Sequence, residues 1–306
     1  MKQFIIIVTF LLGLCAAAQD KPYFQLPIIP DSLSTLQQRT DYMVQHYWDF
    51  CDLKKAFSAR DKMAESFHTY LTFMPYASAD VVYASVDKFM AKIAKQPADV
   101  LFIGEQAESM LYSDTAEFQS DELYLRFAQA IADNKKVDKN AKLRYQHQAK
   151  ILSQSQIGMI APEFDYTDIM GVTQHFVPDT TCVATILYFN DPDCSDCNMA
   201  KLRLDADIKT NRLIESGRVK VVSITPGGVT DEWQLKASSY PASWRIGASE
   251  DVDDIYDIRH TPSFYIIDNN GKIVLKNGDI DIVLRVMSLL NAPRARKSET
   301  NAAANE

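Results

Sequence analysis

Two cysteines, Cys194 and Cys197, stand three residues apart, shortly after an apolar run of strand length at 183–189. Turn-forming residues separate this run from the cysteines, and helix-forming residues follow them at 199–202. The pattern predicts a buried strand, a turn, and a helix that begins with both thiols on one face. Unpaired N–H groups and the positive end of the dipole at a helix N-terminus favour a thiolate. The sequence therefore predicts a reactive dithiol.

The spacing assigns different roles to the two thiols. We expect Cys194 to attack a partner disulfide and Cys197, the buried resolving thiol, to break the mixed disulfide. The alternatives are a permanent structural disulfide and half of a zinc site. Zinc needs two further N or S ligands; Cys182, His260 or Cys51 could serve, but no second paired motif exists. The ligand count favours redox chemistry over a metal, and we expect no cofactor.

Length and charge limit the possible functions. The 306 residues provide enough chain for about two domains. A composition of 47% hydrophobic and 24% charged residues is ordinary for a globular protein with a substantial core. The net charge is −8 and no long basic block is present, so we expect no nucleic-acid partner.

The first residues have the pattern of a cleaved signal peptide at 1–18. Lys2 precedes an apolar run at 4–14, and three alanines follow shortly after it. The run is too short to span a bilayer, which takes about 20 residues. A lipoprotein signal acylated on Cys15 is the alternative, but the residue before that cysteine is Leu14 rather than a small one. Export implies an oxidising compartment.

The periodicity divides the rest of the chain into three parts. Residues 19–157 form an all-helical domain, with about six helices between 31 and 155 and no repeat of fixed period. We expect its aromatic residues, among them Tyr47, Trp48 and Phe50, to fill the core rather than line a groove. Residues 292–306 are polar and aperiodic, which predicts a disordered tail.

Residues 158–291 alternate between strand and helix patterns. Strands are expected near 164–167, 172–177, 183–189, 219–225, 262–267 and 272–275, and helices at 194–216, 230–238, 251–258 and 279–290. Parallel strands with crossover helices, followed by an antiparallel hairpin, predict an α/β fold with a mixed central sheet flanked by helices.

At Cys194-Ser195-Asp196-Cys197 and His260-Thr261-Pro262 the chain resembles the thioredoxin superfamily. The G-x-x-A-P-x-F pattern at 158–164 and the turn at 168–171 are similar to the first hairpin of its periplasmic thiol-disulfide reductase and peroxiredoxin-like branch. Proteins that join such a domain to an N-terminal helical domain of unknown function are known from the Gram-negative envelope. The resemblance implies a thioredoxin-like fold at 158–291 and a location in the periplasm or cell envelope.

The resemblance also implies roles for the second loop. Pro262 would be cis, and Thr261 would offer its backbone to a substrate strand. His260 would lie near the disulfide and could tune it or relay protons; an ordinary exposed loop histidine is the equally open alternative.

Two positions depart from the family pattern. Asp193 stands where an aromatic residue usually precedes the first cysteine, and Tyr188 stands where thioredoxin keeps a buried acid. The base that deprotonates Cys197 is therefore not identified. The negative charges of Asp193 and Asp196 disfavour a thiolate on Cys194, and we expect the dithiol to be a reductant rather than a strong oxidant.

The predicted function is an exported thiol-disulfide oxidoreductase that reduces protein disulfides and is itself supplied by an upstream thiol donor. The alternative is an envelope binding protein whose helical domain captures a partner protein, with the thioredoxin-like domain as scaffold. Cleavage of the signal peptide would remove Cys15, and two further cysteines, Cys51 and Cys182, would then remain beside the dithiol. They could form a second disulfide, although buried thiols are favoured.

Overall fold

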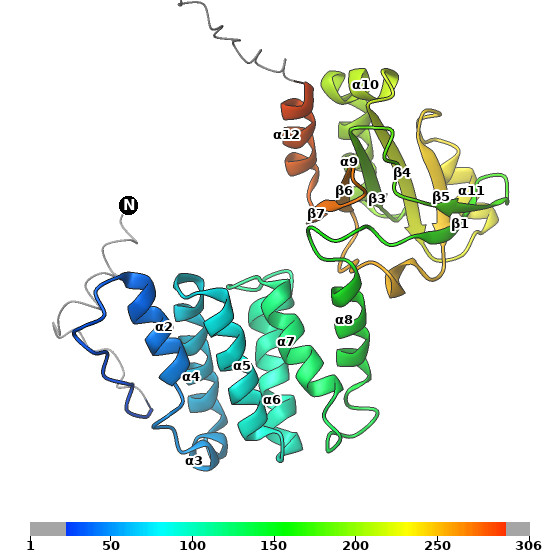
Figure 1. Ribbon diagram of the computed structural model, residues 1–306. Helices are drawn as coiled ribbons and strands as arrows, with labels where there is room; N and C mark the ends of the chain where they lie inside the picture. Colours follow the sequence, from blue (N-terminus) through cyan, green and yellow to red (C-terminus); the bar gives the residue numbers. More distant parts are fainter. Residues whose placement is uncertain (1–22, 292–306) are drawn as a thin grey trace, which may run out of the picture. The chain divides into compact units, whose positions relative to one another are not determined.

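The computed structural model of the protein describes residues 23–291 (Figure 1). The predicted signal peptide at 1–18, with Cys15, and the predicted tail at 292–306 lie outside the described residues. Within 23–291, no helix combines the length and the apolar character that crossing a membrane requires. The described chain forms two compact units: residues 23–110 with 116–118, and residues 111–115 with 119–291.

The first unit is built from short helices around an aromatic core. Trp48 stacks on Phe89 with ring centroids 4.5 Å apart, and the buried Tyr70 hydroxyl donates to Ser85 Oγ at 2.6 Å. Tyr47 and Trp48 are buried as expected, whereas the expectation for Phe50 is wrong, because its side chain is 57% exposed. The helices are α2 (Leu36–His46), α3 (Leu53–Ser58), α4 (Arg60–Phe73), η1 (Met74–Tyr76), α5 (Ala79–Ile93) and α6 (Pro97–Ala107), followed by η2 (Glu108–Tyr112), whose last two residues belong to the second unit.

Two further helices precede the sheet and belong to the second unit: α7 (Asp121–Ala132) and α8 (Leu143–Gln154). No strand precedes Phe164 among the described residues, so the helical region before the α/β part is confirmed. The six-residue α3 was not anticipated, because a helix of under two turns leaves no clear periodicity. The predicted boundary between residues 157 and 158 stays a prediction.

The second unit contains a seven-stranded sheet of order β2-β1-β5-β4-β3-β6-β7. Strands β3, β4 and β5 are parallel to one another, and the other pairs are antiparallel, so the predicted mixed sheet is confirmed. The strands are β1 (Phe164–Asp168), β2 (Thr173–Phe176), β3 (Ala184–Phe189), β4 (Val219–Pro226), β5 (Arg245–Ser249), β6 (Ser263–Asp268) and β7 (Ile273–Gly278).

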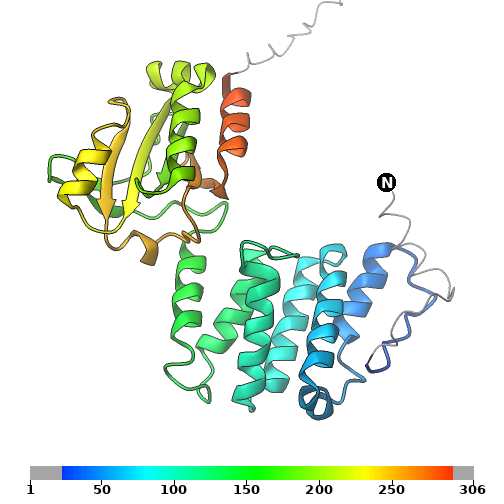
Figure 2. The ribbon, with the colours of Figure 1, turned by 180° about the vertical axis from the view of Figure 1, so that it is seen from behind.

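Three helices cover one face of the sheet, as Figures 1 and 2 show from opposite sides. They are α9 (Ser195–Ala206), α10 (Ile208–Glu215) and α12 (Ile280–Asn291). Their apolar residues pack with Ile186, Tyr188 and Phe264 into one core. The opposite face has its own core, which includes Leu187, Phe189 and the β1–β2 hairpin. Every residue of β3 is buried, as its uninterrupted apolar run predicts.

Three local expectations are wrong. The helix expected at 194–216 is divided at Asp207, whose carboxylate accepts the Thr210 N–H at 2.8 Å and caps α10. The helix expected at 251–258 is only the 3₁₀ turn η3 (Val252–Asp254). Strand β5 was missed, because its sequence, Arg-Ile-Gly-Ala-Ser, carries little β propensity and is held by pairing with β4 and β1.

Gly247 in β5 provides a test of the sheet packing. A Cβ at this position would overlap the Tyr166 ring and lie 3.0 Å from the Thr167 carbonyl oxygen. We expect Gly247→Ala to lower the free energy of unfolding by about 1–3 kcal/mol through overpacking, as measured by denaturant titration. Gly228→Ala is the control, because its Cβ would meet only the end of the flexible Glu250 side chain. Equal stability of both variants would contradict this packing.

Candidate redox site

The dithiol lies where β3 ends and α9 begins. Cys194 is the N-cap of α9, and its Sγ accepts the backbone N–H of Cys197 at 3.1 Å. Both cysteines are free thiols; Cys194 is half-buried and Cys197 is fully buried. An accessible thiol that already accepts a helix N-terminal N–H is placed to act as a nucleophile. The buried thiol one turn later can be reached only from inside the site.

The loop before β6 lies against this dithiol. The Thr261–Pro262 peptide bond is cis, and Cys194 Sγ lies 3.7 Å from the Thr261 carbonyl oxygen. Antiparallel pairing of β3 with β6 sets Phe189 opposite Ser263, so the sheet register itself brings the loop to the thiol.

His260, next to Thr261 in this loop, is exposed. Its Nδ1 lies 3.2 Å from the Pro262 carbonyl oxygen and its Nε2 lies 4.0 Å from Asp114 Oδ1. Among the described residues no hydrogen bond joins His260 to either cysteine. Its predicted influence on the disulfide stays a prediction.

The charges beside Cys194 include the ammonium group of Lys236, which the sequence pattern does not predict. Asp193 forms an ion pair with Lys236 of α11 (Asp231–Ala237), and Lys236 also binds Glu232 at 2.8 Å. The hydrogen bond that Lys236 donates to Asp193, followed by the one it donates to Glu232, raises the pKa of Lys236. Asp196 lies exposed in the first turn of α9. The negative charge of Asp193 is thus largely balanced, and Asp196 keeps the opposing influence on the thiol.

Cys197 is surrounded by apolar and phenolic groups. Burial raises the pKa of the Cys197 thiol to about 12. Tyr188 stacks on Phe264 with centroids 4.5 Å apart and donates its hydroxyl to the Cys197 carbonyl oxygen at 2.7 Å. Burial, and next the proximity of Cys197, raise the pKa of Tyr188 well above its usual value. Tyr188, which stands where the family pattern has a buried acid, is therefore a neutral hydrogen-bond donor and not a base.

A second buried hydroxyl lies beside the same thiol. Tyr240 donates to Asn190 Oδ1 at 2.6 Å, and Asn190 Nδ2 donates to Ser223 Oγ at 2.8 Å. Burial, followed by the charge of Cys197, raises the pKa of Tyr240. The Tyr240 hydroxyl, the Asn190 amide and the Ser223 hydroxyl therefore each have a hydrogen-bond partner despite their burial. Neither Asn190 nor Tyr240 is among the site residues predicted from the sequence. Asn190 stands four residues before Cys194, whereas Tyr240 is 50 residues from Asn190 and meets it only through the fold.

Cys51 and Cys182 are not paired. Cys182 is buried and donates to the Asp179 carbonyl oxygen at 3.3 Å. Cys51 is half-buried, and burial, followed by the charge of Asp52, raises its pKa to about 11. Within residues 23–291 no three His, Cys, Asp or Glu side chains are grouped to hold a metal ion.

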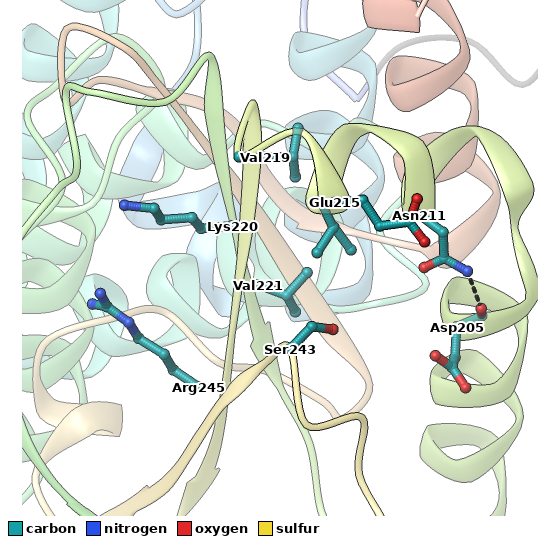
Figure 3. Close-up of a pocket in the computed structure, with 10 residues that line it drawn as sticks. Asp205, Asn211, Glu215, Val219, Lys220, Val221, Ser243 and Arg245 are labelled. Carbon is teal, nitrogen blue, oxygen red and sulfur yellow. Dashed lines mark hydrogen bonds between the residues drawn. The ribbon is translucent and has the colours of Figure 1, made fainter.

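A cavity of about 520 Å³ lies at the start of β4, away from the dithiol (Figure 3). Figure 3 shows Lys220 and Arg245 on one side and Glu215 and Asp205 on the other. Because β3 and β4 are parallel, the start of β4 lies at the opposite end of the sheet from the Cys194 turn. The cavity is therefore not part of the redox site.

Residues 11–155 match a family described as a domain of unknown function, DUF5106. No curated protein matches the chain. Among solved structures, a thioredoxin-like protein from Bacteroides caccae is 20% identical over 87% of this chain and 98% of its own, with a TM-score of 0.71. This likeness confirms the fold: a thioredoxin-like domain preceded by helices.

Two further similar structures each cover less than half of this chain. A conserved protein of unknown function from Bacteroides fragilis is 28% identical over 44% of this chain and 99% of its own, with a TM-score of 0.41. The thioredoxin domain of a thiol-disulfide oxidoreductase from Bacteroides vulgatus is 20% identical over 45% of this chain and 99% of its own, with a TM-score of 0.39.

Differences in thiol accessibility predict a labelling order in the native, reduced protein. At pH 8 a thiol with a pKa of about 11 or 12 is ionised in about one molecule in a thousand or fewer. We expect iodoacetamide to modify Cys194 first, and labelling of Cys51 and Cys197 to accelerate only as the pH approaches those values. Peptide mass spectrometry measures the order. Labelling of Cys197 as fast as Cys194 at pH 8 would contradict the assignment.

Proposed function

We propose that the protein is an exported thiol-disulfide oxidoreductase that reduces disulfides of other proteins. The observation that carries the proposal is the position of Cys194. Its sulfur accepts a helix N-terminal N–H at 3.1 Å and lies 3.7 Å from the Thr261 carbonyl oxygen. The thioredoxin-like fold supports the general redox class, and the substrate, direction and compartment are part of the proposal.

The reaction uses both cysteines. The Cys194 thiolate attacks one sulfur of a substrate disulfide, forms a mixed disulfide, and releases the other sulfur as a thiolate that takes up a proton. Cys197 then loses its proton and attacks Cys194 Sγ, which breaks the mixed disulfide and releases the second substrate thiol. The substrate gains two electrons and two protons, and a disulfide joins Cys194 to Cys197. An upstream thiol donor in the periplasm or cell envelope restores the dithiol.

The buried site determines when the second step occurs. Tyr188 and Tyr240 are neutral and already donate their hydroxyl protons to other oxygens. Neither of them therefore acts as the base that removes the proton from Cys197. The thiol stays protonated while burial disfavours its anion. We infer that the leaving thiolate of the substrate, or water admitted with it, takes the Cys197 proton. This keeps the resolving step dependent on a bound substrate.

Cysteine variants test the proposed activity. We expect the wild type to reduce insulin disulfides with dithiothreitol as donor, and Cys194→Ser to reduce the rate at least 10³-fold because the nucleophile is lost. Cys197→Ser should accumulate a covalent mixed disulfide, visible on non-reducing gels. Cys182→Ser is the control, since Cys182 lies outside the reaction. Equal turnover by wild type and Cys194→Ser would favour the scaffold alternative instead.

The ion pair beside Cys194 predicts the sign of two shifts in reduction potential. Lys236→Met leaves Asp193 unbalanced, which disfavours the thiolate and makes the couple more reducing. Asp193→Asn frees the lysine charge and should shift the potential toward oxidising values. Equilibration with glutathione or dithiothreitol measures both.

The same titration tests the direction of the wild-type reaction. We expect a potential near the thioredoxin value of about −270 mV. A value above roughly −180 mV, the isomerase range, would overturn the assignment as a reductant.

A further inference from the structure

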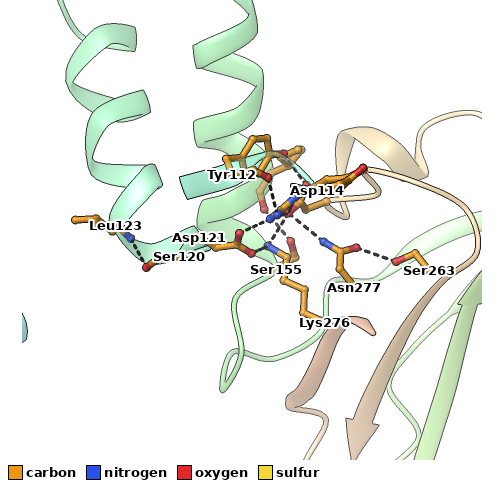
Figure 4. Close-up of polar contacts among 12 residues, drawn as sticks. Tyr112, Asp114, Ser120, Asp121, Leu123, Ser155, Ser263, Lys276 and Asn277 are labelled. Carbon is orange, nitrogen blue, oxygen red and sulfur yellow. Dashed lines mark hydrogen bonds and ion pairs between the residues drawn. The ribbon is translucent and has the colours of Figure 1, made fainter. Parts of the chain in front are cut away.

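A buried network of charged groups lies directly before the cis-proline loop, and no step of the proposed reaction uses it (Figure 4). Its centre is Asp257, which is fully buried. Asp257 binds the Arg259 guanidinium at 2.6 Å and Lys276 Nζ at 2.8 Å. Asp121 forms ion pairs with the same two cations, at 2.7 Å from Lys276 Nζ.

Four separate elements contribute to this network. Tyr112, in η2, donates its hydroxyl to Asp257 Oδ1 at 2.7 Å, and Asp121 is the first residue of α7. Arg259 comes from the loop before Pro262 and donates to the Tyr112 carbonyl oxygen at 2.9 Å. Its guanidinium carbon lies over the Tyr112 ring, 4.0 Å from the ring centroid. Lys276 is on β7. All of these residues lie in the second unit.

The charges of the network balance. Two carboxylates, Asp121 and Asp257, face two cations, Arg259 and Lys276, whose side chains are 9% and 4% exposed. Burial alone would raise the pKa of Asp257, but the bonds from Arg259 and the charge of Lys276 hold it below its usual value. Breaking a buried pair by removing one partner is strongly unfavourable, so the network has a single preferred geometry.

The network is attached to the chain on both sides of the His260–Pro262 segment. Arg259 is separated from Thr261 by one residue, and Thr261 carries the carbonyl that faces Cys194. After the loop, Ser263 Oγ donates to Asn277 Oδ1 at 2.8 Å, and Asn277 Nδ2 donates to Asp257 at 3.3 Å. Both flanks of the His260–Pro262 segment are therefore attached to the same buried carboxylate.

We propose that Tyr112 and Asp121 are positioning residues of the redox site. Together with Lys276, they hold Asp257 and Arg259, and so fix the Thr261 backbone beside Cys194 where a substrate segment binds. Both residues lie within the segment that matches DUF5106, 11–155. Two residues that precede the sheet and belong to the second unit thus complete the substrate-binding loop, an inference that rests on the proposed function.

Hydrogen exchange tests the positioning step without needing activity. Asp121→Asn and the milder Tyr112→Phe, made in the full chain, should increase amide exchange in peptides covering 258–264 at least about tenfold. Peptides from β3 and β4 should exchange as in the wild type. The matched control is Asp179→Asn, which removes the ion pair with Lys220 at the far end of the sheet. Unchanged exchange at 258–264 in both variants would overturn the proposal.

Steady-state kinetics test the consequence for substrate binding. With a protein disulfide substrate, we expect Asp121→Asn and Tyr112→Phe to raise KM roughly tenfold and to change kcat by less than about twofold. Reaction of Cys194 with a small aromatic disulfide, which needs no Thr261 contact, should be unchanged. A general loss of folding would lower both rates together, and thermal melting would detect it. Unchanged KM in both variants would overturn the role in binding.

The two proposals fail differently. If the wild type turns over no disulfide substrate, yet both variants exchange faster than the wild type at 258–264, the proposed reaction is refuted and the positioning of the loop is supported. Active variants with wild-type KM and wild-type exchange would support the reaction and refute the positioning role.

Discussion

The pairing of β3 with β6 is the constraint on which the site depends. It sets Phe189 opposite Ser263, and the two chain segments that leave this end of the sheet are the turn to Cys194 and the loop of Thr261. Neither segment has a regular structure of its own that could hold it there. The sulfur-to-carbonyl distance of 3.7 Å follows from strand register together with the point at which α9 begins. A one-residue slip of β6 would also reverse which of its side chains face each core, so packing fixes the register.

Packing also explains how the two thiols come to differ. Cys194 ends an exposed turn and caps α9, whereas one helical turn later Cys197 faces the core that Tyr188 and Phe264 share. The difference in accessibility is therefore a property of the helix phase and needs no dedicated polar group. The phenols of Tyr188 and Tyr240 preserve this difference, because they satisfy nearby oxygens without adding charge beside the thiol.

The sequence predicted the parts of the site that depend on short-range order. The apolar run at β3 and the spacing of Cys194 and Cys197 were enough to place the strand, the turn and the helix start. It did not predict Lys236 as the partner of Asp193, because the two residues are distant in sequence and meet only through the fold. Strand β5 was missed for a related reason: its order comes from its neighbours on both sides. The division of the expected long helix at Asp207 depends on a single side-chain cap, which composition alone does not distinguish from an ordinary helical aspartate.

Hydrophobic periodicity and compactness are different properties of a chain, and only the first can be read directly from the sequence. The periodicity changes where helices give way to strands, and the predicted boundary between residues 157 and 158 rests on that change. The contacts of Asp121 and Tyr112 cross this change in periodicity, because they join helical residues to a loop more than 130 positions later. Long-range ion pairs between single residues leave no periodic signal. A segment can thus be helical in pattern and still belong, by its buried charges, to the unit that contains the dithiol.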